Sequence, residues 1–170
     1  FAVNQADKVA QQVRNTGESL TQSQRLAKSV TQALVGSNPA FTEVSDSASV
    51  LAKSVRGLKS GDEVLRLSPV AAEFQSDIDK IVPLMEKAER AAAVVMGQQK
   101  ILTQVGAALR TINRQSSDLL EVAETVSSLK LQQNASPAEI SAAGQLVMLT
   151  QRIGKSANEF MTATEGLSPE

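Results

Sequence analysis

Residues 1–35, which read FAVNQADKVAQQVRNTGESLTQSQRLAKSVTQALV, decide the fold class of this chain. A series with three- and four-residue spacing runs through them, at Val3, Ala6, Ala10, Val13, Gly17, Leu20, Gln24, Ala27, Thr31 and Leu34. This spacing places the series on one face of a helix and is typical of helices that pack in bundles. The pattern ends at Gly36-Ser37-Asn38-Pro39, because glycine, two capping residues and proline disfavour continuation of the helix.

Three further stretches carry the same kind of signal. We expect a second helix from about Phe41 to Lys59, closed by Ser60-Gly61-Asp62. The pair Ser68-Pro69 predicts the start of a third helix, because serine is a good N-cap and proline suits the first turn. Asn134-Ala135-Ser136-Pro137 repeats this signal and predicts a last helix to about Thr164, before Gly166-Leu167-Ser168-Pro169.

The region around Gly97 has two interpretations. The apolar series that ends at Val95 and the series from Ile101 to Leu129 each keep a helical spacing, but they are out of phase, and the slip falls at Gly97. Either a turn joins two antiparallel helices there, or one long helix changes its supercoil phase. We favour the turn, because it completes four segments that can bury one another's apolar faces.

Composition favours an all-α fold, with long antiparallel helices in a four-helix-bundle-like module. Of the 170 residues, 42% are hydrophobic but only 2% are aromatic, so aliphatic side chains must fill the core. The absence of Cys and His excludes thiol nucleophiles, imidazole bases and most transition-metal sites. Because the net charge is −1 and no basic stripe is present, we expect no nucleic-acid partner. We expect no enzyme activity, no catalytic residue, no metal and no cofactor.

An internal repeat is the most informative feature. Residues 17–30, GESLTQSQRLAKSV, align with residues 144–157, GQLVMLTQRIGKSA, and five positions are identical. The identical pairs are Gly17/Gly144, Gln24/Gln151, Arg25/Arg152, Lys28/Lys155 and Ser29/Ser156. A tandem duplication explains this similarity. We predict that residues 1–132 form a first module and residues 133–170 the opening helix of a second, truncated module.

The repeated polar residues are the candidate site for a ligand or an interface: Gln24, Arg25, Lys28, Gln151, Arg152 and Lys155. The spacing places Gln24 and Gln151 on the apolar seam, where a buried amide needs hydrogen-bonding partners and can fix helix register. Arg25 and Lys28 flank that seam. Two interpretations remain open: the cations cover the core with their methylene stems, or the amides and guanidinium groups hold an anion or a second subunit.

The residues of the second copy carry a family resemblance. Residues 140–155, ISAAGQLVMLTQRIGK, resemble the opening-helix motif of PilJ/NarX-type sensor domains, roughly I-x-x-A-G-x-x-x-M-L-[ST]-Q-R-[MI]-[AG]-K. The first copy keeps Gly17, Ser23, Gln24, Arg25 and Lys28 but lacks the Met-Leu pair. Residues 81–85, IVPLM, are similar to the third-helix region of such sensors.

This resemblance implies the periplasmic portion of an inner-membrane, methyl-accepting chemoreceptor that controls twitching motility by type IV pili. It implies a homodimer that passes its signal by helix displacement, with a pilin subunit or a small anionic ligand as the stimulus. It also implies a chemotaxis kinase and adaptor that are reached through a cytoplasmic part outside this chain. The alternative is a structural coiled-coil module for dimerisation, without a ligand site of its own.

Overall fold

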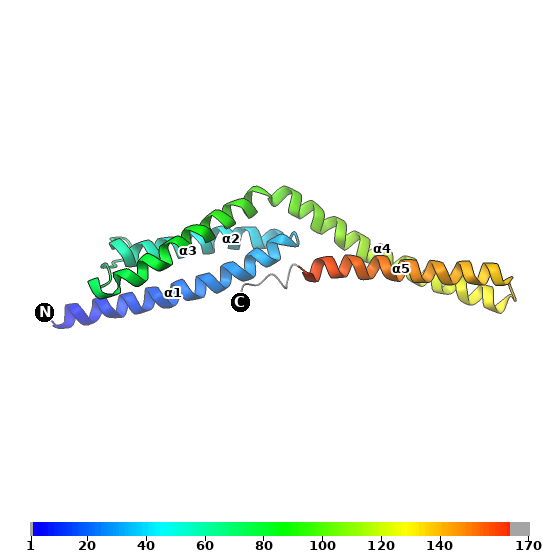
Figure 1. Ribbon diagram of the computed structural model, residues 1–170, viewed down its shortest axis with the longest axis horizontal. Helices are drawn as coiled ribbons and strands as arrows, with labels where there is room; N and C mark the ends of the chain where they lie inside the picture. Colours follow the sequence, from blue (N-terminus) through cyan, green and yellow to red (C-terminus); the bar gives the residue numbers. More distant parts are fainter. Residues whose placement is uncertain (1, 164–170) are drawn as a thin grey trace. The chain divides into compact units, whose positions relative to one another are not determined.

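The computed structural model describes residues 2–163, with side chains for residues 5–162. It contains five helices, α1 (Ala2–Leu34), α2 (Asn38–Ser60), α3 (Ala72–Gly97), α4 (Gln99–Gln132) and α5 (Pro137–Ala163) (Figure 1). No strand occurs among these residues, and one isolated bridge joins Asp62 to Leu67. The predicted all-α bundle is therefore confirmed. The predicted end of the last helix at Thr164 and the Gly166 to Pro169 signal lie outside the described residues.

The predicted stop after α1 is confirmed. Gly36 adopts the left-handed conformation, with φ of 80°, and the Ser37 N–H donates to the Gln32 carbonyl over 3.1 Å. This arrangement satisfies carbonyls that the end of a helix leaves free. The second helix begins at Asn38, slightly earlier than predicted, because Pro39 fits its first turn.

The start of α3 differs from the prediction. Ser68 and Pro69 do not cap it, because the helix begins only at Ala72. The preceding segment is instead bound to the neighbouring helices: the Val70 N–H donates to the Leu58 carbonyl over 2.9 Å. The side-chain amide of Gln12 donates to the Ser68 and Pro69 carbonyls over 3.1 and 3.0 Å. These hydrogen bonds to other helices hold Ser68 and Pro69 outside α3, although their sequence is a local signal for the start of a helix.

The predicted turn at Gly97 is wrong. The Gln98 N–H donates to the Val94 carbonyl over 3.2 Å, and the Leu102 N–H donates to the Gln98 carbonyl over 2.9 Å. Helical hydrogen bonding therefore passes through the single residue between α3 and α4. Gly97 also lacks the positive φ of Gly36 and Gly61, so it does not supply a tight reversal. The alternative of a long helix that changes phase describes this region better.

The chain divides into two compact units. The first holds α1, α2 and α3 and extends to Leu102, and the second begins at Thr103 in α4 and contains α5. The predicted modules are residues 1–132 and 133–170. They were inferred from a repeat in the sequence, whereas the compact units are defined by contacts in the structure. The division into units therefore does not test the modules, and they stay a prediction.

The core of the first unit lies where α2 packs between α1 and α3. Its buried residues are Leu26, Ala33, Ala40, Phe41, Val44, Ala48, Leu51, Ala52, Val55, Met85 and Ala92. Phe41 is the largest fully buried side chain, at 1% exposure. Because most of these residues belong to α2, this shorter helix organises the unit.

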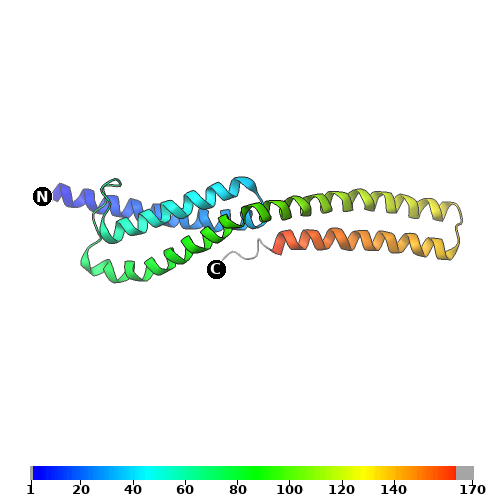
Figure 2. The same cartoon turned by 90° about the horizontal axis from the view of Figure 1, so that it is seen from above.

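The second unit is an antiparallel hairpin of α4 and α5, whose helices lie side by side in both views (Figure 2). Its buried residues are small: Ser116, Ala123, Ala143, Thr150 and Ala157. A Cβ added to Gly154 of α5 would lie 3.6 Å from the Ser116 Cβ of α4, so the backbones approach closely here. Small side chains therefore form the contact between the two helices, and the larger apolar side chains lie outside it.

A capping box closes the hairpin. The Ser136 N–H and hydroxyl donate to Glu139 over 3.1 and 2.9 Å, and Lys130 forms an ion pair with Glu139 over 2.8 Å. The hydrogen bond from Lys130, followed by those from Ser136, lowers the pKa of the Glu139 carboxyl to about 2. The predicted start of the last helix at Asn134 to Pro137 is thus confirmed, with Asn134 in the left-handed conformation.

Candidate functional site

The first copy of the repeated motif lies on α1, facing α2. Arg25 Nη2 lies 4.0 Å from Glu43 Oε1, with both side chains almost half exposed. Ser29, which is fully buried, donates its hydroxyl to the Arg25 carbonyl over 2.6 Å and to Glu43 Oε2 over 3.3 Å. Lys28 is exposed and Gln24 is exposed. An exposed pair at this distance contributes little to stability, so Glu43 does not fix the Arg25 side chain, which remains accessible.

The predicted burial of Gln24 and Gln151 is wrong, because both side chains are exposed in the structure. The buried amide on α1 is Gln22, which donates to Glu18 over 2.6 Å. The face that α1 turns toward α2 and α3 is the one that carries Gln22, Leu26, Ser29 and Ala33. The apolar series chosen from the sequence lies on a different face of the same helix.

Two members of that series, Val13 and Leu20, are exposed on α1 together with Val9, which the series did not include; we call these three residues the α1 stripe. These side chains are 52%, 66% and 62% exposed. They recur at spacings of four and seven residues, as in a packing seam, yet nothing in the first unit covers them. The α1 stripe is therefore an apolar helix face without a partner inside its own unit.

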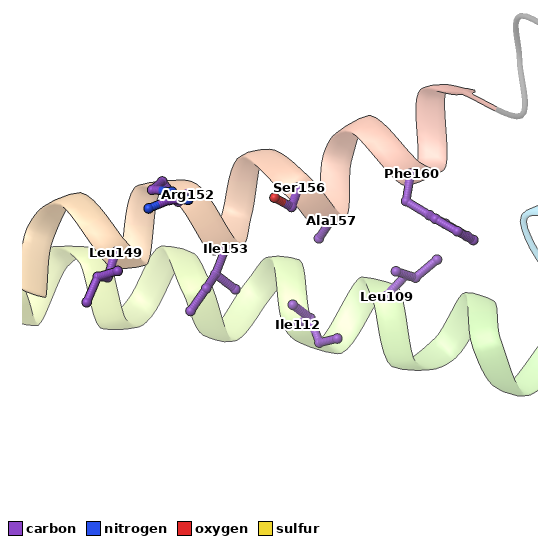
Figure 3. A pocket seen from close by; sticks show the side chains of 8 residues that line it. All are labelled: Leu109, Ile112, Leu149, Arg152, Ile153, Ser156, Ala157 and Phe160. Carbon is purple, nitrogen blue, oxygen red and sulfur yellow. The ribbon is translucent and has the colours of Figure 1, made fainter.

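The second copy of the motif borders a groove on the hairpin. Arg152 lines this groove, and Figure 3 shows its side chain on α5. The groove has a volume of about 690 Å³ and is lined by Leu109, Ile112, Leu149, Arg152, Ile153, Ser156, Ala157 and Phe160. Lys155 pairs with Glu159 over 3.7 Å along α5, whereas Arg152 has no ion pair among the described residues. We call this region the Arg152 groove.

The two copies thus have different surroundings. Arg25 meets a carboxylate, whereas the equivalent Arg152 borders aliphatic side chains. Ser29 is buried, whereas the equivalent Ser156 is exposed. Because α1 and α5 belong to different compact units, the structure describes the two sets of candidate residues separately.

Sequence reasoning missed part of the Arg152 groove. Leu109 was not among the candidates because it lies on α4, whereas the motif was traced along α5 alone. Phe160 was not among them because it lies on α5 beyond the end of the motif. Phe160 is 55% exposed, and a rare aromatic residue on an exposed helix face was the available signal.

The Arg152 groove has the features of a binding surface. Around the Arg152 groove, one guanidinium group lies beside apolar side chains and no carboxylate or other base lines the surface. Among residues 2–163, no group of three or more acidic, His or Cys side chains could hold a metal ion. None of the helices described is both long enough and apolar enough to cross a membrane. Fold and site together define a helical interaction or signalling module.

The comparison with known families specifies that class. The family described as the type IV pili methyl-accepting chemotaxis transducer N-terminal region matches residues 1–111, so this chain belongs to the PilJ family. The family consists of signal transducers rather than enzymes. No curated protein sequence matches the chain. The match covers the whole first unit but not residues 140–155, so the predicted tandem repeat stays a prediction.

Proposed function

We propose that this chain is the periplasmic sensory region of an inner-membrane, methyl-accepting transducer that controls twitching by type IV pili. Membership of the transducer family supports the general role. The proposal adds a signal that passes along the helices as a small displacement. A helix of 34 residues, such as α4, spans roughly 50 Å and can carry a shift between distant ends.

The α1 stripe is the observation that carries the proposal. Exposed apolar patches of this kind mark interaction surfaces, because burying them removes apolar area from water. We assign a second copy of the chain as the partner, with α1 packed against α1. A seam with three- and four-residue spacing is self-complementary in such a pair, as in coiled coils. The sensory region is then a homodimer.

The small-residue contact of the hairpin supports displacement as the signal. Ala143, Thr150 and Ala157 recur every seven residues on the face of α5 that contacts α4. Side chains of this size form low ridges, so a shift of about one or two ångströms requires little repacking. The Arg152 groove next to this contact is the proposed entry point for the stimulus.

The chemistry of the Arg152 groove defines the stimulus that fits it. An apolar surface with a single guanidinium group suits an apolar protein segment with a carboxylate, such as part of a pilin subunit, or a small anion with an apolar body. The kinase and adaptor of the chemotaxis pathway are reached through the cytoplasmic part of the transducer.

The proposal is tested in cells that carry the intact transducer. The double substitution Val13→Glu, Leu20→Glu places charges on the α1 stripe, so we expect loss of the dimer and of stimulus-dependent twitching at an unchanged amount of receptor. The control is Val64→Glu, since Val64 is 80% exposed on the α2–α3 loop. Normal twitching by the α1 variant would contradict the proposal.

A structural dimerisation module is the second candidate, because the α1 stripe serves it equally well. The sensory function and the structural function predict different effects when the candidate site residues are replaced. Arg25→Ala together with Arg152→Ala removes both motif guanidinium groups from exposed positions, so the fold is retained. A sensory region then loses its response to the stimulus, whereas a structural module signals as before.

A further inference from the structure

The loop between α2 and α3 is a fixed structure rather than a free connection. Asp62 and Leu67 exchange both backbone hydrogen bonds, at 3.0 and 2.8 Å, and the Leu65 N–H donates to the Asp62 carboxylate over 2.9 Å. Leu67 is buried, and its Cδ1 would lie 3.0 Å from a Cβ added to Gly57 of α2. The loop therefore has a defined conformation against α2.

Two amide side chains of α1 bind the structure around this loop. Gln12 donates to the Ser68 and Pro69 carbonyls, and Asn15 donates to the Ser54 carbonyl of α2 over 2.9 Å. Between α1 and the loop lies a pocket of about 400 Å³, lined by Gln11, Arg14, Asn15, Glu18, Leu65, Arg66 and Leu67. This volume is within the range of about 300–1,000 Å³ for small-molecule sites.

The charges around this pocket are arranged for a ligand. Arg14 and Arg66 both line it, and neither has an ion pair among the described residues. Glu18 is the single carboxylate of the lining, and Gln22 donates to its Oε1. Arg66 has φ of 52°, a conformation that glycine or asparagine adopts more readily than arginine. An arginine at this position therefore indicates a use for its side chain.

We propose that this pocket binds a free α-amino acid with an apolar side chain. Two guanidinium groups match a carboxylate, which accepts paired hydrogen bonds from arginine. Glu18 faces the same space and supplies the counter-charge for the ammonium group. Leu65 and Leu67 provide an apolar wall for the side chain. The proposal goes beyond the sensory role and does not depend on it, because binding is measurable on the isolated chain.

An inorganic anion fits the pocket less well than a zwitterion. The carboxylate of Glu18 repels phosphate, and phosphate leaves the wall of Leu65 and Leu67 without a contact. A ligand with a carboxylate but no amine can bind the guanidinium groups of Arg14 and Arg66, but it forms no ion pair with Glu18. Each part of the lining therefore corresponds to one chemical group of an amino acid.

Titration calorimetry of the 170-residue chain tests the proposal with three probes: L-leucine, 4-methylpentanoate, which lacks the amine, and inorganic phosphate. We expect L-leucine to bind at least about tenfold more tightly than either of the others. Arg14→Ala and Arg66→Asn should each weaken L-leucine binding at least about tenfold. Arg110→Ala, which removes an exposed guanidinium group of α4, should leave it unchanged.

Two variants separate binding from folding. Arg66→Asn places a residue that tolerates the left-handed conformation at that position, so its thermal midpoint should equal or exceed that of the parent while leucine binding falls. Glu18→Gln should weaken L-leucine binding but not 4-methylpentanoate binding. The proposal is overturned if L-leucine does not bind at millimolar concentration, if both arginine variants bind it normally, or if phosphate binds equally well and Glu18→Gln has no effect.

Discussion

Replacement of Phe41 by alanine should destabilise the first unit more than any change of an exposed residue. The ring is 1% exposed, and its neighbours in the core, such as Val44 at 0%, are equally inaccessible to water. Truncation therefore removes nearly the full transfer free energy of the ring and leaves an apolar cavity. For such sites the loss is about 3–5 kcal/mol. In a unit of about one hundred residues this lowers the unfolding midpoint by more than about 10 °C.

Circular dichroism during guanidinium and thermal unfolding measures this loss, because the chain has no Trp or Tyr for fluorescence. Phe74→Ala is the matched control: it deletes the same ring from a position on α3 that is 54% exposed, and should cost less than about 1 kcal/mol. Equal losses for the two variants would refute the assignment of Phe41 to the core of the unit.

Two further predictions concern the loop and the hairpin. Gly57→Ala should destabilise the chain by about 1–3 kcal/mol in denaturant titrations. The new Cβ would lie 3.0 Å from Leu67 Cδ1 and 3.3 Å from Asp62 Cβ, and these two residues cannot move away easily, because Leu67 is buried and two backbone hydrogen bonds join it to Asp62. Gly17→Ala, with nothing within 4 Å, should stabilise α1 by about 0.5–1 kcal/mol. Glu139 has a pKa lowered from 4.5 to about 2, so its stabilising effect is complete above pH 4.5 and is lost as the pH falls toward 2. Thermal unfolding between pH 2 and pH 4.5 should show that the midpoint of Glu139→Gln depends less on pH than the midpoint of the parent. The midpoint of Glu121→Gln, an exposed change on α4, should depend on pH as the parent's does.

Local signals in the sequence predicted several helix ends correctly. These signals act within a few residues. At the end of α1 the backbone N–H groups of Gly36 and Ser37 bond preceding carbonyls, although the Ser37 side chain forms no capping bond. At the start of α5 Ser136 bonds Glu139. The start of α3 was wrong because it depends on a bond from Val70 to Leu58 of another helix. At Gly97, a shift in apolar phase indicated a reversal, but backbone hydrogen bonds through Gln98 decide that region.

The inward face of α1 could not be predicted from hydrophobicity. The α1 stripe is exposed, whereas the buried face contains Gln22 and Ser29, which satisfy their polar groups within α1 and with Glu43. Periodicity alone does not tell which apolar positions of a helix pack inside its own unit and which stay exposed. The candidate residue Arg152 was found from its motif, but its groove required the pairing of α4 with α5.

Disulfide crosslinking in the intact transducer can detect packing of two copies through the α1 stripe, because residues 1–170 contain no native cysteine that would interfere. A cysteine at Val13 on the α1 stripe should crosslink to the same position of a second copy, and a cysteine at Asp7, exposed on another face of α1, should not. We expect the yield at Val13 to change when cells contact a surface and their pili are engaged. Equal crosslinking at both positions would rule out the α1 dimer, and a yield at Val13 that is the same with and without surface contact would rule out its role in signalling.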